Sequence, residues 1–459
     1  MWTASERLDS CYFEFPLSSQ GEAVRGLGWT WPSPLCAQCP CYSAVPMATV
    51  MSRLLPPGAS PDASRLVMAR GLRGFADGMV SVLLAKYLTD LGFSAGEIGV
   101  LITGTLLGSA ALTLASGLWG ARFTPKQVLL VACGLMLITG VGFASVTSFW
   151  PLLLVAVVGT LNPSGGDVSV FLPTEQSMLT ETIEPRRRTA LFARYTLTGT
   201  FAAAIGALCA GLPVLIARSQ DIDLLDAQRA GFLVYAVVAV TIWLLYTTLS
   251  PSPPPAGRPR APLQKSRAIV IKLSAVFSLD SFGGGFVVQS LLVLWLFKRF
   301  DLSVETAGAI FFVAGLLSAS SQLVSPWLAD RIGLIRTMAY THIPSNIFLI
   351  LAALMPTAPL AVAMLLARTA LSQMDVPARQ SYVMSVVPPE ERAAAASVTN
   401  VPRSLASAFA PALGGLLLSQ TTFGWPLILG GGVKLAYDVL LLREFASVRP
   451  EEEVVVARA

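Results

Sequence analysis

Apolar stretches of about 20 residues, long enough to cross a bilayer, follow one another along most of the chain. Short polar segments separate them, so hydropathy rises and falls as in a multi-pass membrane protein. The pattern predicts twelve transmembrane helices, at residues 70–90, 97–119, 127–148, 150–179, 189–217, 230–250, 268–298, 304–328, 335–355, 358–387, 394–419 and 425–443. The predicted fold class is therefore an all-α membrane protein.

Basic residues mark alternate connections between these stretches, which tests the segmentation independently. One set of connections holds Arg65, Arg70, Arg73, Arg122, Lys126, Arg186, Arg187, Arg188, Arg258, Arg260, Lys265, Arg267, Lys272, Arg331, Arg336, Arg392, Arg443, Arg449 and Arg458. The other set holds only Lys86, Arg218, Arg229, Lys298 and Arg299. Short cytoplasmic loops attract Lys and Arg. The bias predicts that both termini are cytoplasmic, in a multi-pass protein of the inner (plasma) membrane.

A Pro-rich break near the middle of the chain divides the predicted helices into two groups of six. Residues 1–66 differ from the rest because they lack any sustained helical or strand period. We interpret them as a disordered extension, or as sequence that precedes a start at Met47, Met51 or Met68. The predicted organisation is this extension, an N-terminal bundle at 67–250, a cytoplasmic linker at 251–266, a C-terminal bundle at 267–443 and a cytoplasmic tail at 444–459.

An internal repeat with an offset of 204 residues supports two related halves. Six residues at the end of the fourth predicted helix and the start of the fifth recur in the tenth and eleventh. They are Pro173, Gln176, Ser177, Pro185, Arg188 and Ala190, matched by Pro377, Gln380, Ser381, Pro389, Arg392 and Ala394. Close helix packing alone would explain small and helix-ending residues. Two related halves around a central site are also a common transporter design.

Two loops share a pattern: residues 327–333 read WLADRIG, and residues 117–126 read GLWGARFTPK, with Ala121 where the first has Asp330. The pattern resembles a loop motif of the major facilitator superfamily, roughly G-x-L-A-D-R-x-G-R-K. The resemblance implies two six-helix bundles and transport by alternating access. It also implies a cytoplasmic gate, which we assign to Arg122, Asp330 and Arg331. Residues 410–415, APALGG, are similar to a G-P-x-x-G-G element of family antiporters, although that element belongs to the fifth helix and this copy lies in the eleventh.

Ionisable residues inside predicted helices are costly and are therefore candidate functional sites. The candidates for proton coupling are Asp77, Asp167, Asp280 and Asp375. A low dielectric favours the neutral, protonated form of a carboxyl group, which a proton carrier needs. Asp77 is the leading candidate, with an ion pair to Arg73 as the structural alternative. Asp280 precedes three glycines, which indicates a hinge or a close helix crossing.

The candidates for substrate binding are Asn162, Gln289, Arg368 and Arg379. Asn162 begins a Pro- and Gly-containing break in the fourth helix, which either frees backbone groups for ligands or only kinks the helix. Arg368, Asp375 and Arg379 would share one face of a continuous tenth helix. Glu175 and Arg379 occupy equivalent repeat positions, which would allow an ion pair between the halves.

Composition narrows the function class. Hydrophobic residues make up 54% of the 459 residues and charged residues only 13%, and mean hydropathy is +0.65. The net charge of +5 gives no reason to expect a nucleic-acid partner. The sole histidine, His342, has no acid or cysteine beside it in the sequence, and the Cys36, Cys39 and Cys41 cluster lacks a second ligand pair. We expect no metal, no cofactor and no enzymatic activity.

The sequence therefore predicts a monomeric secondary transporter in a lipid bilayer. It would move a small organic solute by alternating access, most simply as a proton-coupled efflux antiporter. An uncoupled facilitator is the closest alternative, and a transporter-derived sensor or channel is a more distant one. The substrate, the direction of transport and the coupling ion are not readable from the residues.

Overall fold

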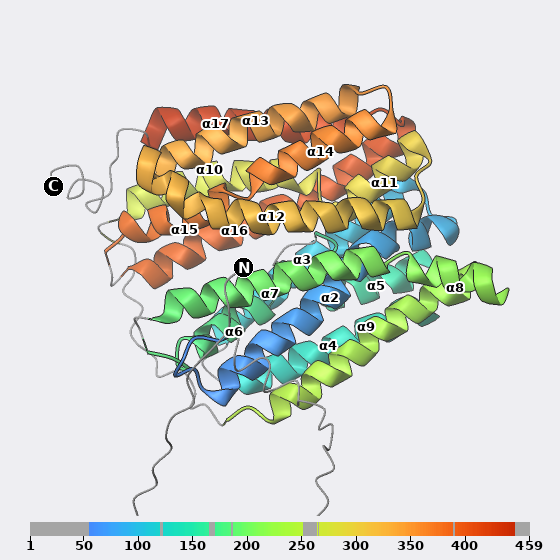
Figure 1. The fold of residues 1–459 in the computed structure, drawn as a ribbon, viewed down its shortest axis with the longest axis horizontal. Helices are drawn as coiled ribbons and strands as arrows, with labels where there is room; N and C mark the ends of the chain where they lie inside the picture. The colour runs from blue at the N-terminus through green and yellow to red at the C-terminus, as the bar shows by residue number, and fades with distance from the viewer. Residues whose placement is uncertain are drawn as a thin grey trace, which may run out of the picture. The chain divides into compact units, whose positions relative to one another are not determined.

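A computed structural model describes residues 55–119, 123–164, 170–184, 187–250, 264, 266–388 and 391–445. Within these ranges the regular secondary structure is helical, and no strand occurs. Figure 1 shows that the helices run side by side along a common direction. This arrangement is the all-α membrane fold that the hydropathy pattern predicts.

The helices of the N-terminal half overlap the first six predicted stretches. They are α2 (Pro61–Asp90), α3 (Ala95–Trp119), α4 (Pro125–Ser145), α5 (Phe149–Val158), α6 (Phe171–Leu179), α7 (Arg188–Cys209), α8 (Leu212–Gln220) and α9 (Leu224–Thr247). Those of the C-terminal half are α10 (Arg267–Gly285), α11 (Gln289–Phe300), α12 (Val304–Ile332), α13 (Leu334–Leu354), α14 (Ala358–Ser372), α15 (Asp375–Ser385), α16 (Arg392–Gln420) and α17 (Trp425–Phe445).

Four of the twelve predicted helices are each divided into two. These are α5 with α6, α7 with α8, α10 with α11, and α14 with α15. The described part of the chain contains nine segments long and apolar enough to span a membrane, and the helix order is consistent with twelve crossings. The continuous tenth helix that we expected is wrong, because α14 ends at Ser372 and α15 starts at Asp375.

The first helix begins earlier than the sequence suggested. Proline suits a first helical turn, where its missing N–H costs nothing, and α2 starts at Pro61 rather than near residue 70. Ala63 and Leu66 are fully buried, and the backbone N–H of Ser250 donates to the Asp62 carboxylate at 3.2 Å. Residues 61–66 therefore belong to the helical fold and not to an extension. Residues 1–54, and with them the cysteine cluster, lie outside the described residues.

Local sequence explains how helices begin and end next to the two motif-bearing loops, at residues 117–126 and 327–333. Thr124 caps α4, since its hydroxyl accepts from the N–H of Gln127 at 3.3 Å and the Gln127 side chain accepts from the N–H of Thr124 at 2.9 Å. In the second copy, Gly333 separates α12 from α13 with a φ of 87°, a conformation that glycine adopts without strain. The second loop is thus a tight turn between α12 and α13, and a capping box starts α4 after the first.

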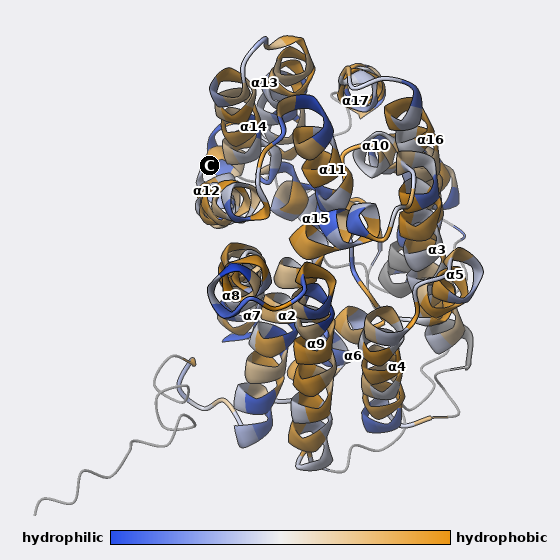
Figure 2. Cartoon of the chain, turned by 90° about the vertical axis from the view of Figure 1, so that its right-hand side faces the viewer, coloured by the Kyte–Doolittle hydropathy of each residue, from blue (hydrophilic) through white to orange (hydrophobic). Residues whose placement is uncertain are grey.

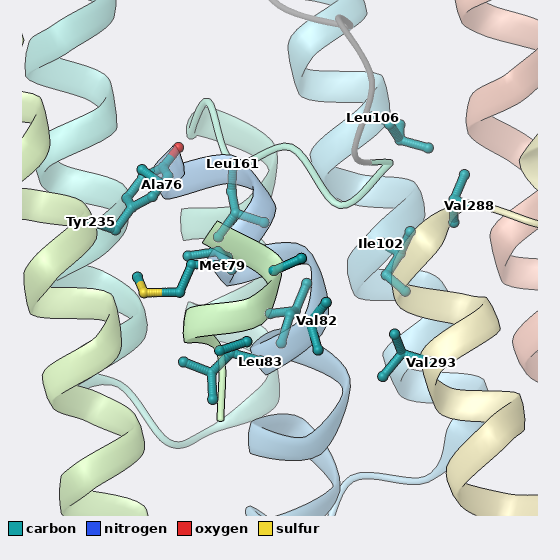
Figure 3. Close-up of a cluster of buried hydrophobic side chains, with 14 of the residues drawn as sticks. Ala76, Met79, Val82, Leu83, Ile102, Leu106, Leu161, Tyr235, Val288 and Val293 are labelled. Carbon is teal, nitrogen blue, oxygen red and sulfur yellow. The ribbon is translucent and has the colours of Figure 1, made fainter. Parts of the chain in front are cut away.

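Apolar residues, orange in Figure 2, occur along the helices throughout the bundle. Large apolar residues are more than half exposed on several helices, including Leu154, Val237 and Leu323. Inside, one hydrophobic cluster joins residues of both halves. Figure 3 shows Ile102 and Leu106 of α3 facing Val288 and Val293 near the start of α11. An apolar outside over an apolar inside suits a protein surrounded by lipid.

Candidate functional site

The helix bundle has two ends that differ in charge. We call "basic end" the end where α2, α4, α7, α10, α13 and α16 begin, and "opposite end" the other one. The basic end carries the Arg- and Lys-rich connections, and it lies near the labels α6 and α15 in Figure 1.

The two halves touch along seams that run from the middle of the bundle toward the opposite end. α3 packs on α16, and α7 packs on α12. A Cβ on Gly99 of α3 would lie 2.5 Å from the carbonyl oxygen of Pro411 and 2.9 Å from Cα of Gly415. The Thr103 hydroxyl also accepts from the backbone N–H of Ala412 at 2.9 Å. The antiporter-like element at 410–415 is therefore a packing surface between the halves.

Ser290 connects the halves at the centre. It lies in the first turn of α11, and its hydroxyl donates to the backbone oxygen of Ser81 at 2.7 Å. Its backbone N–H donates to the oxygen of Pro163, at 3.1 Å, in the break after α5. That break frees the Pro163 carbonyl from helical pairing, so the interrupted fourth and seventh predicted helices meet through backbone groups.

The two described residues of the predicted gate, Asp330 and Arg331, make no hydrogen bond or ion pair with a described residue of the other half. Asp330 is exposed and has no hydrogen bond or ion pair to any described residue. Arg331 is exposed as well, and its guanidinium stacks on the ring of Trp327 at 4.0 Å within the same helix. Arg122 lies outside the described residues. The gating role stays a prediction, and in this structure the described contacts between the halves lie away from the basic end.

A buried ion pair stabilises the N-terminal half. The two terminal nitrogens of the Arg73 guanidinium donate to the two carboxylate oxygens of Glu175 at 2.8 and 2.7 Å. The hydroxyls of Tyr195 and Tyr246 also donate to Glu175, and the Phe171 ring lies 4.6 Å from the guanidinium carbon. Both charged side chains are almost inaccessible to solvent. A bidentate pair with further donors satisfies the charges of both groups.

A larger cluster lies in the C-terminal half, around Asp280 of α10. One carboxylate oxygen of Asp280 accepts from Lys434 Nζ at 2.6 Å, and the other accepts from Arg379 at 3.0 Å. Arg379 also contacts Asp375, one turn away on α15, at 3.3 Å. Asp280 and Asp375 are thus already paired with cations. The glycines after Asp280 make a close crossing, since a Cβ on Gly283 would lie 2.9 Å from the Gly430 oxygen on α17.

His342 joins this cluster from α13. Its Nδ1 lies 2.8 Å from Asp438 Oδ1, and its Nε2 lies 3.5 Å from Lys434 Nζ. The side-chain amide of Asn346 donates to the other oxygen of Asp438 at 2.9 Å. The sequence analysis missed this site because His342 and Asp438 are 96 residues apart. A usable signal was present in the spacing: two polar residues four apart on each of two apolar helices, α13 and α17.

The ion pairs of the two halves occupy equivalent elements but have opposite polarity. In the N-terminal half the cation lies on α2 and the anion on α6, whereas in the C-terminal half the anion lies on α10 and the cation on α15. Glu175 and Arg379 each pair inside their own half. The ion pair between the halves, which symmetry allowed, is therefore wrong for this structure.

The remaining predicted residues have different surroundings. Asp77 is buried on α2, one turn before Ser81. Asn162 is buried, and its carbonyl oxygen accepts from the N–H and hydroxyl of Ser164, which caps the break locally. Gln289 is half-buried at the start of α11. Arg368 is half-buried on α14, and its Nε has no partner in the described part of the chain. Asp167 lies outside the described residues.

Comparison with known proteins identifies the family. The model of the Major Facilitator Superfamily matches residues 66–401 and 281–458, which together include all the helices but the first turn and a half of α2. The chain belongs to the Major Facilitator Superfamily. Superfamily members are transporters, so the chain is a membrane transporter of small solutes and not an enzyme.

Similar proteins agree with this membership in the Major Facilitator Superfamily. The uncharacterized membrane protein YJR124C of Saccharomyces cerevisiae is 26% identical over 433 residues, covering 85% of this chain and 95% of the yeast protein. Among solved structures, the partially occluded inward-open xylose transporter XylE from E. coli has a TM-score of 0.68 at 15% identity, over 86% of this chain and 99% of XylE. An inward-facing bacterial homologue of the human lysosomal transporter Spinster has a TM-score of 0.67 at 17% identity, over 86% and 99%. At these identities the structures show a shared fold.

Proposed function

We propose that the protein is a secondary transporter that exchanges protons for a small organic solute and exports the solute by alternating access. One observation carries the proposal. The described contacts between the halves run from the centre to the opposite end, while the gate residues Asp330 and Arg331 at the basic end are exposed. An arrangement closed at one end and open at the other is one of the two states that rocking halves alternate between.

The buried carboxylates support proton coupling. Asp77 lies on α2, next to the Ser81–Ser290 contact that joins the halves, so its charge state would act on the surface that must rearrange. Protonation removes a charge that otherwise resists movement through a dry, closed state. Asp280 and Asp375 remain candidates, but both already contact cations: Arg379 and Lys434 for Asp280, and Arg379 for Asp375.

The orientation and location extend the same proposal. The excess of basic residues supports a cytoplasmic basic end, with both termini in the cytoplasm. The proposal also takes the protein to be a monomer in the plasma membrane. In that orientation the described contacts between the halves lie toward the outside of the cell, as expected for the cytoplasm-facing loading state of an exporter. The antiporter-like residues 410–415 support exchange rather than symport.

Flux in proteoliposomes tests the proposal. Purified protein would be reconstituted with an internal pH dye, and xylose, uridine and ethidium would be added in turn with and without a pH gradient. We expect a pH gradient to drive at least one of these probes uphill and the probe to move protons in return. Accumulation that only equilibrates the probe, with no proton movement, would instead show a facilitator and refute coupling.

Two substitutions separate coupling from gating. Asp77→Asn should abolish gradient-driven transport while exchange of labelled for unlabelled probe continues, because exchange needs no net proton release. Asp330→Asn should slow all modes alike without changing their pH dependence, because it weakens only the closed state of the gate. Unchanged gradient-driven transport in Asp77→Asn would remove Asp77 from the mechanism.

A further inference from the structure

The hydrogen bonds of His342 define which of its nitrogens is free to take a proton. An ionised Asp438 carboxylate can only accept, so beside it Nδ1, at 2.8 Å, carries the hydrogen of the neutral ring, and the Asn346 amide, whose nitrogen also lies 3.2 Å from Nδ1, donates to Asp438 instead. Asn346 holds the other oxygen of Asp438 at 2.9 Å and thereby fixes the carboxylate. The lone pair of Nε2 then points toward Lys434 and Asp280, at 3.5 and 3.8 Å. A neutral histidine is therefore presented with its basic nitrogen facing an acid–base pair.

Charged groups of both signs surround His342. Its contacts include two carboxylates, Asp438 and Asp280, and one ammonium, Lys434, so the nearest groups sum to −1 when the ring is neutral. Protonation brings that sum to zero. Opposite charges within about 4–6 Å stabilise the charged form of an ionisable group, and burial opposes it.

Groups farther out limit this preference and keep the proton exchangeable. Arg379 and Asp375 on α15 contact Asp280 or each other, and they cancel in charge. Arg368 on α14 and Arg403 on α16 are two more cations whose charge acts on Asp280. The uncharged Tyr437 of α17 stacks edge-on against the His342 ring at 5.8 Å. The outer arginines weaken proton binding that the two carboxylates strengthen, as a site that must also release its proton requires.

We propose that His342, held between Asp438 and Asp280, is a proton-binding site of the C-terminal half, in addition to Asp77 in the N-terminal half. A proton from water binds the Nε2 lone pair, and no covalent bond breaks. The imidazolium then competes with Lys434 for the same oxygen of Asp280, the Oδ1 that now lies 2.6 Å from Lys434. Proton binding thus changes the pairing among α10, α13 and α17. The coupling of this change to transport rests on the proposed function.

Because the chain contains one histidine, the proton on it can be observed directly. The full chain, purified without a histidine tag and labelled with [¹³Cε1]-histidine, would give one imidazole signal in lipid nanodiscs. We expect that signal to titrate reversibly between pH 5 and 9. Asp438→Asn should weaken proton binding at least about tenfold, because it removes the carboxylate nearest to the ring. Lys434→Met should strengthen it.

The double variant Arg73→Met with Glu175→Gln is the matched control, because it removes a buried carboxylate of the other half together with its cation and should leave the titration unchanged. A signal that does not titrate in the wild-type protein overturns the proposal, and so does an unchanged midpoint in Asp438→Asn. The wild-type titration decides the question even if that variant does not fold.

A distance measurement links the site to conformation without requiring a substrate. Spin labels at Phe123 and Arg336, two exposed positions of the basic end in different halves, would be measured at pH 5.5 and 8.5 in a cysteine-free background. We expect a pH-dependent distance that His342→Gln reduces. No pH dependence in the wild-type protein would count against proton coupling, and hence against the proposed function. A wild-type pH dependence that His342→Gln retains in full would overturn the role of His342 alone.

Discussion

Removing one member of the buried Arg73–Glu175 pair should destabilise the protein more than removing both charges. Arg73→Met leaves the Glu175 carboxylate with two tyrosine hydroxyls but no cation, and Glu175→Gln leaves the guanidinium without an anion. Breaking a buried pair in this way costs about 3–5 kcal/mol for each single variant. The double variant has no stranded charge and loses only hydrogen bonds, at about 1–3 kcal/mol for an unpaired buried group. The coupling energy should therefore exceed about 2 kcal/mol.

Unfolding in mixed detergent micelles, followed by tryptophan fluorescence at increasing SDS, would give the four free energies of this cycle. Asp226→Asn, at the exposed Arg229–Asp226 pair, is the control and should lie within about 0.5 kcal/mol of the wild type. Additive single effects, or single effects below about 1 kcal/mol, would refute the reasoning. Such a result would mean that water reaches the pair and screens it.

Three further predictions concern the seam, the N-terminal boundary and the topology. Gly99→Val should separate α3 from α16, because the valine Cβ would meet the Pro411 oxygen. A cysteine substituted for Thr103 should then be alkylated faster, and an unchanged rate would mean that the seam does not depend on close packing. A chain that starts at Met51 should elute as a sharp peak in size-exclusion chromatography, whereas one that starts at Met68 loses the buried Ala63 and Leu66 and should melt at a lower temperature; equal melting would contradict the α2 boundary. Reporter fusions after Ala459 and in the 219–228 connection should report opposite sides of the membrane, and the same side for both would refute the predicted topology.

The fold was predictable from the sequence because a lipid environment requires each spanning helix to be apolar, which makes the hydropathy pattern easy to recognise. A helix that crosses a bilayer needs a long apolar run, and such runs are visible without knowledge of their partners. The interruptions were less visible: Gly283 to Gly285 and Pro163 indicated two of the four breaks, but the one before Asp375 has neither Gly nor Pro at the break itself. Hydropathy does not register where a backbone leaves the helical path.

The candidate site was predictable only as a set of residue types. Acidic residues are conspicuous in apolar helices, so Asp77 and Asp280 could be chosen as candidates solely because a charged group inside a membrane is energetically costly. Their partners depend on helix packing across long sequence separations, 102 residues for Arg73 and Glu175 and 96 for His342 and Asp438. The spacing of polar residues marks the polar face of each helix, but it does not say which helix that face meets. His342 illustrates the limit, since its neighbours in the sequence are apolar or uncharged.

The reversed polarity of the two ion pairs has a consequence for how two halves of common origin can diverge. A chain made of two identical halves would carry the same sign at positions 175 and 379, yet here the signs are Glu and Arg. Changing either charge alone strands its partner in a low-dielectric interior, so a change of sign at position 175 or 379 requires a matching change on the facing helix, which now carries Arg73 on α2 and Asp280 on α10. A hybrid that combines α2 with α15 would bring Arg73 against Arg379. The halves are therefore no longer interchangeable helix by helix, although their backbones still follow one plan.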